Sequence, residues 1–234
     1  MAASARWRGL QDLFEHVPLD DRAKGQLIDE MSKPNRLYHG VGHLELLWRR
    51  HRLYSGGVGL ADPAIDTLVA CAIAYHDSVY DHSRSDNEDR SAEFWLRASA
   101  GSGVDDEDRQ WVAQTIRATK DHLAYAPDAK AASAEARLRE RARAWVLDLD
   151  LTPLGEPPDV FDGNTRLLRA ESGHLSDEAW EASMLAFGRR FLAAPRIYRF
   201  PELGAIFESS ARRNLARLPL SQNGIAGQRP ANTQ

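Results

Sequence analysis

The sequence predicts an all-α fold, on three observations. Apolar residues recur at helical spacing along almost all of the 234 residues. Alternation of apolar and polar residues is nowhere long enough for a sheet. Glycine- and proline-containing stretches such as residues 55–63 (SGGVGLADP) and 101–106 (GSGVDD) break the pattern at intervals. A chain of helices joined by short turns is therefore expected.

The helical pattern divides into ten segments. We expect helices over residues 4–16, 19–32, 38–54, 63–76, 86–99, 106–124, 134–150, 157–172, 176–193 and 202–217. Pro34 with Asn35 breaks the chain before the third segment, and Asp62 before Pro63 is typical of a helix start. Ser176, followed by two acidic residues, indicates another start.

These helices are expected to form a single all-α domain over residues 1–218. Residues 219–234 end in SQNGIAGQRPANTQ, which mixes Gly, Pro, Asn and Gln without apolar periodicity. Such a composition cannot bury enough apolar surface to order itself, so we predict a disordered C-terminal tail.

Composition narrows the class of protein. A hydrophobic content of 43% suits a soluble globular chain, and a net charge of −4 argues against a dedicated nucleic-acid-binding surface. The single cysteine, Cys71, excludes an internal disulfide framework. Neither a signal peptide nor an apolar run of membrane-spanning length is evident, so we expect a cytoplasmic protein without membrane contact. The sequence leaves a homo-oligomer open.

The first chemical motif is YHGVGH, in which His39 and His43 lie four residues apart. On a helix, this spacing places both imidazoles on one face. A zinc protease would need a glutamate directly after the first histidine, whereas Gly40 follows here, so that class is excluded. Because the chain has eight histidines, such a pair arises readily by chance. The pair alone is therefore weak evidence for a metal site.

The second motif is IAYHDSVYD, where His76 and Asp77 follow an almost wholly apolar helix. Burying an imidazole and a carboxylate is costly unless each has a partner. A cation would satisfy both, and side chains at a helix end can converge on one point when the backbone leaves the helix. The alternative is a salt-bridged pair at the surface.

The third motif is DLDLTPLG, which contains Asp148 and Asp150. Residues two apart on a helix point about 200° apart, so only one carboxylate should face a shared site. We favour Asp150, whose helical neighbours are somewhat more apolar, and keep Asp148 in reserve. The alternative for either is a helix-end carboxylate that pairs with Arg141 or Arg143.

In this order, YHGVGH, AYHDSVYD, SDNEDRSAEF, IRATKDH, DLDLTPLG and PRIYR resemble the H…HD…D signature of the HD-domain metal-dependent phosphohydrolase superfamily. More narrowly, they resemble a group of small bacterial predicted HD phosphohydrolases, from about Tyr38 to Leu218. The resemblance implies an all-α HD-domain helical bundle with a divalent metal site in its core. It also implies these metal ligands: His43, His76, Asp77 and Asp150.

YHGVGH also resembles the YHxxxH motif of cyclic-nucleotide phosphodiesterases, which share the core of this fold. The resemblance implies that His39 protonates the leaving oxygen while His43 binds metal. This chain is shorter and lacks the substrate-pocket signature of those enzymes, so cyclic nucleotides are not implied.

Two further segments carry candidate residues. Asn87 and Glu88 open the helix after the second motif, where either could orient a metal-bound water. N-capping by Asp86 and acidic residues in the first turn explain that segment equally well. In ATKDH, Lys120 is a candidate for the substrate phosphate and His122 for a second metal. Cations that favour a helix C-terminus are the alternative there.

The last candidates lie in PRIYR. Arg196 and Arg199 could bind phosphate as planar forks, with Tyr198 stacking on a base. Packing of the arginines against the carboxyl end of a neighbouring helix is equally plausible.

The resulting prediction is a divalent-metal-dependent phosphohydrolase that acts on a nucleotide or another small phosphate ester through a metal-activated water. Its expected catalytic residues are His39, Asp77 and Glu88. Mixed nitrogen and oxygen ligands suit Mn, Mg, Co, Ni, Zn or Fe to different degrees and do not choose among them. Two alternatives remain: a diiron HD-type oxygenase, which His122 would permit, and a non-catalytic nucleotide-binding domain.

Overall fold

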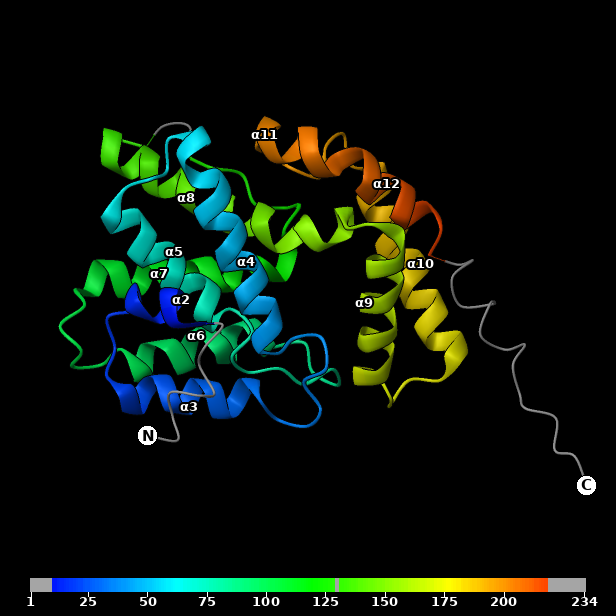
Figure 1. Cartoon of the computed structure of the whole chain (residues 1–234), viewed down its shortest axis with the longest axis horizontal. Helices are drawn as coiled ribbons and strands as arrows, with labels where there is room; N and C mark the ends of the chain where they lie inside the picture. The colour runs from blue at the N-terminus through cyan, green and yellow to red at the C-terminus, as the bar shows by residue number, and fades with distance from the viewer. Residues whose placement is uncertain (1–9, 129–130, 219–234) are drawn as a thin grey trace, which may run out of the picture. The chain divides into compact units, whose positions relative to one another are not determined.

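The computed structural model describes residues 10–128 and 131–218. All regular structure in these ranges is helical, which confirms the predicted all-α fold (Figure 1). Within them, no helix is long and apolar enough to cross a membrane. The arrangement as an HD-type bundle stays a prediction.

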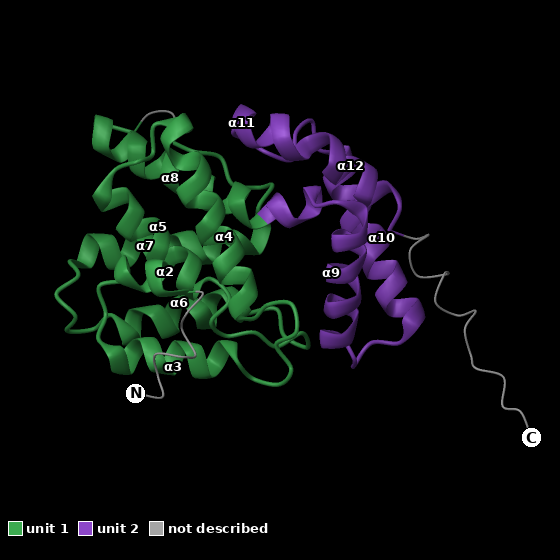
Figure 2. Cartoon of the chain, in the orientation of Figure 1, with its two compact units in different colours: residues 1–150 green, residues 151–234 purple. Residues whose placement is uncertain are grey.

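The chain forms two compact units, residues 1–150 and 151–234 (Figure 2). Unit 1 contains α2 (Gln11–Glu15), α3 (Asp21–Met31), α4 (Val41–Tyr54), η2 (Ser55–Val58), α5 (Pro63–Tyr75), α6 (Asn87–Ala98), α7 (Asp106–Ala118), η3 (Thr119–Asp121) and α8 (Ala134–Leu151), whose last residue belongs to unit 2. Unit 2 continues with η4 (Thr152–Gly155), α9 (Pro158–Glu171), α10 (Asp177–Ala193), α11 (Pro201–Leu203), the π-helical η5 (Gly204–Glu208) and α12 (Ser209–Ala216). The expected single domain stays a prediction, and the expected tail lies outside the described residues.

Two predicted helix starts are confirmed. The Asp62 carboxylate accepts hydrogen bonds from the backbone N–H groups of Ala64 and Ile65 at the start of α5. The Ser176 hydroxyl accepts one from Ala179 at the start of α10. Each side chain satisfies backbone donors that have no partner within the helix, which is why these residue types mark helix starts.

Helix α4 begins at Val41, three residues later than the sequence predicts. Gly40, its N-cap, is extended, and a Cβ there would lie 3.0 Å from the carbonyl oxygen of Arg36 and 3.3 Å from that of Met31. This close backbone approach favours glycine at the N-cap position. His39 therefore precedes α4, whereas His43 lies in its first turn, and the two histidines do not share a helical face.

Helix α5 lies at the centre of unit 1, where it contacts α2, α4, α6 and α7. Its residues from Leu68 to Tyr75 are all buried, which explains why this segment is apolar on every side rather than on one stripe. Cys71 is one of these core residues, with 2% of its surface exposed. The buried helix ends directly at His76, its C-cap, so the core itself delivers this imidazole to a fixed position.

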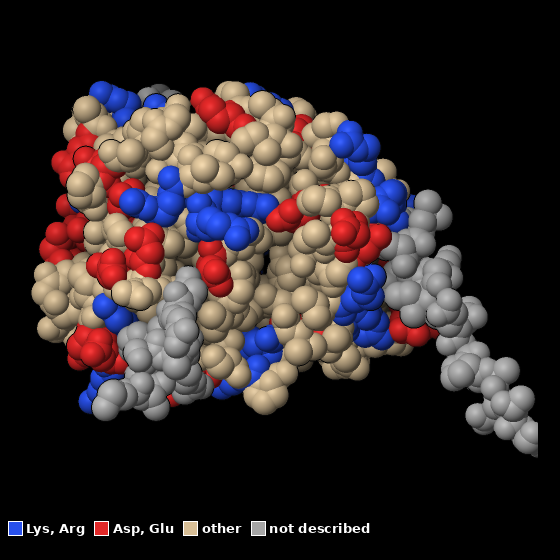
Figure 3. Space-filling model, in the orientation of Figure 1, with Lys and Arg blue, Asp and Glu red and all other residues tan. Residues whose placement is uncertain are grey.

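On the face drawn in Figure 3, basic and acidic side chains lie close to one another. Ion pairs also join charged residues of unit 1, among them Arg139 with Asp108 at 2.6 Å and Arg117 with Asp89 at 3.2 Å. Each such pair compensates one positive and one negative charge. That the chain has no dedicated nucleic-acid-binding surface stays a prediction.

A buried polar network joins α4, α5 and α8. The indole N–H of Trp145 donates to Nδ1 of His51 at 3.1 Å, and an indole nitrogen can only donate. Nδ1 is therefore the acceptor, and Nε2 carries the proton that it donates to Asp66 at 2.9 Å. The other oxygen of Asp66 accepts from Arg52 at 3.0 Å. His51 is thus a neutral, fully buried imidazole with both nitrogens satisfied.

We expect this network to make unit 1 sensitive to acid. Burial lowers the pKa of His51 below its ordinary value of 6.5, although Asp66 opposes the change. Below pH 6.5 the His51 side chain binds a proton in the unfolded chain but not in the folded chain. The free energy of unfolding therefore decreases by up to about 1.4 kcal/mol for each unit by which the pH is lowered. Urea unfolding from pH 7.5 to 5 measures this slope.

The matched comparison uses His51→Gln and His174→Gln. His51→Gln removes the buried imidazole, so the free energy of unfolding should depend less steeply on pH than in the wild type. His174→Gln alters an exposed histidine and should keep the pH dependence of the wild type. Identical slopes in wild type and His51→Gln would contradict the assignment.

Candidate metal centre

His43, His76 and Asp150 converge in the interior of unit 1 and form a group that could hold a metal ion. His43 lies in the first turn of α4, His76 follows α5, and Asp150 lies at the end of α8. Their ligand atoms all lie within 4.8 Å of one another. Both imidazoles are buried, and 14% of the Asp150 side chain is exposed.

The spacing of the three ligand atoms fits a single cation. Nε2 of His43 lies 3.3 Å from Nε2 of His76 and 3.0 Å from Oδ1 of Asp150. The third edge of the triangle, from Nε2 of His76 to Oδ1 of Asp150, is 3.6 Å. Ligand atoms bound at about 2.0–2.2 Å with angles between about 90° and 110° lie roughly 2.8–3.6 Å apart. All three observed edges agree with such a triangle.

The orientation of His76 favours a positive charge at this point. Its Nδ1 lies 2.9 Å from the carbonyl oxygen of Ile73, an acceptor, so Nδ1 carries a proton. In the neutral ring, Nε2 then presents a lone pair to the carboxylates of Asp77, at 3.1 Å, and Asp150. Facing acceptors repel one another unless a proton or a cation lies between them. Fixing the tautomer through Nδ1 is also how metal-binding histidines are usually oriented.

The pKa values of the group point the same way. Burial alone would lower the pKa of His76, but the carboxylates of Asp77 and Asp150 hold it well above its ordinary value. Burial alone would raise the pKa of Asp150, yet the surrounding imidazoles hold it well below. Asp150 therefore carries a negative charge at neutral pH, and the centre attracts cations.

Asp77 lies beside His76 but outside the group of three. Its Oδ2 is 3.1 Å from Nε2 of His76, and 17% of its side chain is exposed. Burial would raise the pKa of Asp77, but the imidazoles of His76 and His39 hold it below its ordinary value. Its role as a metal ligand stays a prediction.

Asp150, rather than Asp148, is the carboxylate that lies with the histidines. Asp148 is fully buried and is not a member of the group, in keeping with the opposite directions of residues two apart on a helix. The second oxygen of Asp150 lies 2.8 Å from Nε2 of His122. The Asp150 carboxylate thus contacts His43 on one oxygen and His122 on the other.

His39 lies next to this group in an aromatic cluster. Its ring stacks on Tyr80 with centroids 3.9 Å apart, and it lies 6.2 Å from the ring of His43. The Tyr80 hydroxyl lies 3.2 Å from Nε2 of His82, and Tyr38 packs edge-on against His39 at 4.8 Å. His39 is therefore held by neighbouring rings beside the centre rather than within it.

Arg36 is a positioning residue that the sequence analysis missed. One nitrogen of its buried guanidinium donates to the carbonyl oxygens of His39 at 3.0 Å and Asp77 at 2.6 Å, and another donates to Ser78 at 2.8 Å. These bonds fasten the segment before α4 to the segment after α5. An arginine just ahead of YHGVGH is the only trace in the sequence, because carbonyl partners leave no pattern.

Asn87 closes a loop. Its amide oxygen accepts from the backbone N–H of Asp81, and its amide nitrogen donates to the carbonyl oxygens of Asp81 and Arg84. Asp86 makes no side-chain cap, because its carboxylate binds Arg84 at 2.6 Å. Glu88 is half-buried in the first turn of α6, and its carboxylate has no hydrogen bond or ion pair with any described residue.

The other candidates are placed as follows. Lys120 is exposed and donates to the carbonyl oxygen of Ser85 at 2.7 Å. Arg196 and Arg199 belong to unit 2, where Arg196 is exposed and Arg199 is half-buried. Tyr198 is buried, and its hydroxyl donates to the carbonyl oxygen of Leu151 at 2.9 Å. The Tyr198 ring is part of the core of unit 2, and its stacking on a base stays a prediction.

Comparisons with protein families, with characterised proteins and with solved structures give no match. The resemblance to the HD-domain superfamily therefore stays a prediction from the sequence. The arrangement of His43, His76 and Asp150 does not depend on this resemblance, because it is defined by the positions of their three side chains alone.

We expect Arg36→Met to loosen the centre. The substitution leaves three carbonyl oxygens without a charged donor, which should lower the free energy of unfolding by about 3 kcal/mol. It should also weaken metal binding, because the segments that carry His39 and Asp77 lose their shared anchor. Chemical denaturation and metal titration measure the two effects.

Arg97→Met is the control, since Arg97 forms only an exposed pair with Glu93 at 3.8 Å. Its unfolding free energy should change by at most about 0.5 kcal/mol. Equal losses in the two variants would show that the bonds of Arg36 do not fix the centre.

Proposed function

We propose that this protein is a divalent-metal-dependent phosphohydrolase that acts on a nucleotide or another small phosphate ester. The observation that carries the proposal is the triangle of His43, His76 and Asp150, whose edges of 3.0 to 3.6 Å suit one cation. The ordered resemblance of the motifs to HD-domain phosphohydrolases supports the reaction class.

The residues of this site have different proposed roles. His43, His76 and Asp150 would hold the ion, with Asp77 adding negative charge beside His76. A divalent cation bound there would neutralise charge on phosphoryl oxygens and lower the pKa of a bound water from 15.7 toward about 7. Glu88 has a carboxylate that no described side chain engages, which leaves it free to orient that water.

His39 is proposed as the proton donor to the leaving oxygen. Its ring stacks on Tyr80 beside the centre, so it is held within reach of a substrate without belonging to the triangle. An imidazole can give up a proton and take one back, as a general acid must. Such general acid catalysis contributes roughly a hundredfold to ten-thousandfold to the rate.

The proposal predicts that metal binding and turnover separate. His76→Ala should lose both, because it removes one corner of the triangle. His39→Gln should keep the metal and lower kcat by roughly a hundredfold or more. The measurements are metal content after reconstitution and phosphate release across a panel of phosphate esters with Mn, Mg, Co, Ni and Zn.

His16→Gln serves as the control, since His16 belongs to the same unit but not to the centre. It should keep both metal and turnover. Unchanged metal content and unchanged phosphate release in His76→Ala would refute the proposal.

A diiron oxygenase is the second candidate, and His122 favours it. Because Nε2 of His122 lies 2.8 Å from the second oxygen of Asp150, the same carboxylate has an imidazole on each side. This candidate predicts two irons per chain, and an activity that requires both iron and oxygen and is lost in His122→Ala. Activity with one equivalent of Mn, Co or Mg and no dependence on iron would exclude it.

A further inference from the structure

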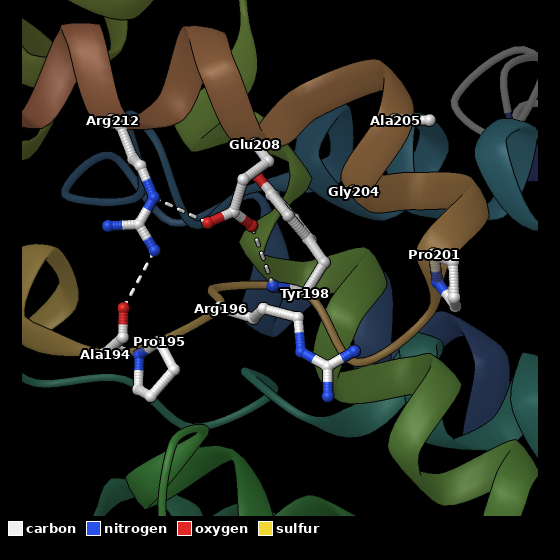
Figure 4. A pocket seen from close by; sticks show the side chains of 9 residues that line it. All are labelled: Ala194, Pro195, Arg196, Tyr198, Pro201, Gly204, Ala205, Glu208 and Arg212. Atoms are coloured by element: carbon white, nitrogen blue, oxygen red, sulfur yellow. Dashed lines mark hydrogen bonds and ion pairs between the residues drawn. The ribbon is translucent and has the colours of Figure 1, made fainter.

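Unit 2 contains a pocket of its own, between the segment after α10 and the helices η5 and α12 (Figure 4). Its volume is about 690 Å³, within the range of small-molecule sites. The lining residues that matter here are Pro195, Arg196, Pro201, Ala205, Glu208 and Arg212. They all belong to unit 2, so the pocket is described without reference to the metal centre.

The acidic residue of the pocket is fully engaged. The Glu208 carboxylate accepts hydrogen bonds from the backbone N–H groups of Ile197 and Tyr198 and from Nε of Arg212 at 2.7 Å. The other two nitrogens of Arg212 donate to the carbonyl oxygens of Leu192 and Ala194. Glu208 and Arg212 therefore neutralise each other's charge.

Arg196 is the remaining charged residue of the pocket. Figure 4 shows its guanidinium pointing away from the Glu208–Arg212 pair. Arg196 is exposed and has no hydrogen bond or ion pair with any residue in the described ranges. The pocket thus carries one uncompensated positive charge, on a planar fork that suits a carboxylate or a phosphate.

The walls around this charge are apolar and fixed. Pro195 and Pro201 each have a backbone φ locked by the side-chain ring, and Ala205 adds a small apolar surface. The segment that carries Arg196 is fastened through Glu208 on one side and through Arg212 on the other. The backbone around Arg196 is therefore already fastened, so ligand binding needs to order only the Arg196 side chain, which favours affinity.

We propose that this pocket binds a small organic anion, whose carboxylate or phosphate group pairs with Arg196 and whose compact apolar body lies against Pro195, Pro201 and Ala205. Because unit 2 forms it entirely, the site goes beyond the proposed hydrolase and does not depend on a metal.

Calorimetric titration of the full chain with benzoate and with phenyl phosphate tests the proposal. At least one of them should bind saturably at one site per chain, and the tighter probe identifies the preferred anionic group. Arg196→Gln should weaken binding roughly tenfold to a hundredfold, and Ala205→Trp should weaken it by filling the pocket. Arg189→Gln, which alters another exposed arginine of unit 2 outside the pocket, should leave it unchanged.

Further probes separate this site from other anion binding. Benzyl alcohol, which lacks the charge, and inorganic phosphate, which lacks the apolar body, should both bind more weakly. Binding should persist with EDTA and in His76→Ala, whatever becomes of the proposed hydrolase. No saturable binding, equal affinity in Arg196→Gln or Ala205→Trp, an equal loss in Arg189→Gln, or loss in His76→Ala would each overturn the proposal.

Discussion

The carboxylate of Asp150 is the contact on which the centre of unit 1 depends. One oxygen lies 3.0 Å from His43 and the other 2.8 Å from His122, so α8 meets α4 and the end of η3 at a single side chain. Its charge also raises the pKa of His76. Burial alone would raise the pKa of Asp150, but the surrounding imidazoles stabilise its charge and hold this pKa well below its ordinary value.

The rest of unit 1 serves to keep these side chains in register. Helix α5 is buried on all sides and ends at His76, so that imidazole has little freedom to move. Arg36 fastens the segments before α4 and after α5 through their carbonyl oxygens. The network of His51 and Trp145 links α4 to α8 away from the centre. The packing of α5 and the hydrogen bonds of Arg36 and His51 thus hold the charged side chains of the candidate metal centre in place, as a preorganised site requires.

The sequence was sufficient for features that depend on local chemistry. Helix positions follow from apolar spacing, and Asp62 caps α5 as expected. Helical geometry indicates that only one of Asp148 and Asp150 faces the centre, and the more apolar neighbours of Asp150 favour that residue. The sequence was insufficient where contacts with backbone groups determine the local structure. Gly40, directly before α4, lies close to the carbonyl oxygens of Arg36 and Met31, and such backbone contacts leave no pattern in the sequence. Two of the three carbonyl partners of Arg36 lie some forty residues away in the sequence, which no residue pattern reveals.

Anomalous diffraction from crystals grown with Mn²⁺ can show whether one cation binds at His43, His76 and Asp150. We expect an anomalous peak about 2.0–2.3 Å from Nε2 of both histidines and from an oxygen of Asp150. An empty position there at saturating Mn²⁺, or a peak bound by other residues alone, would contradict it.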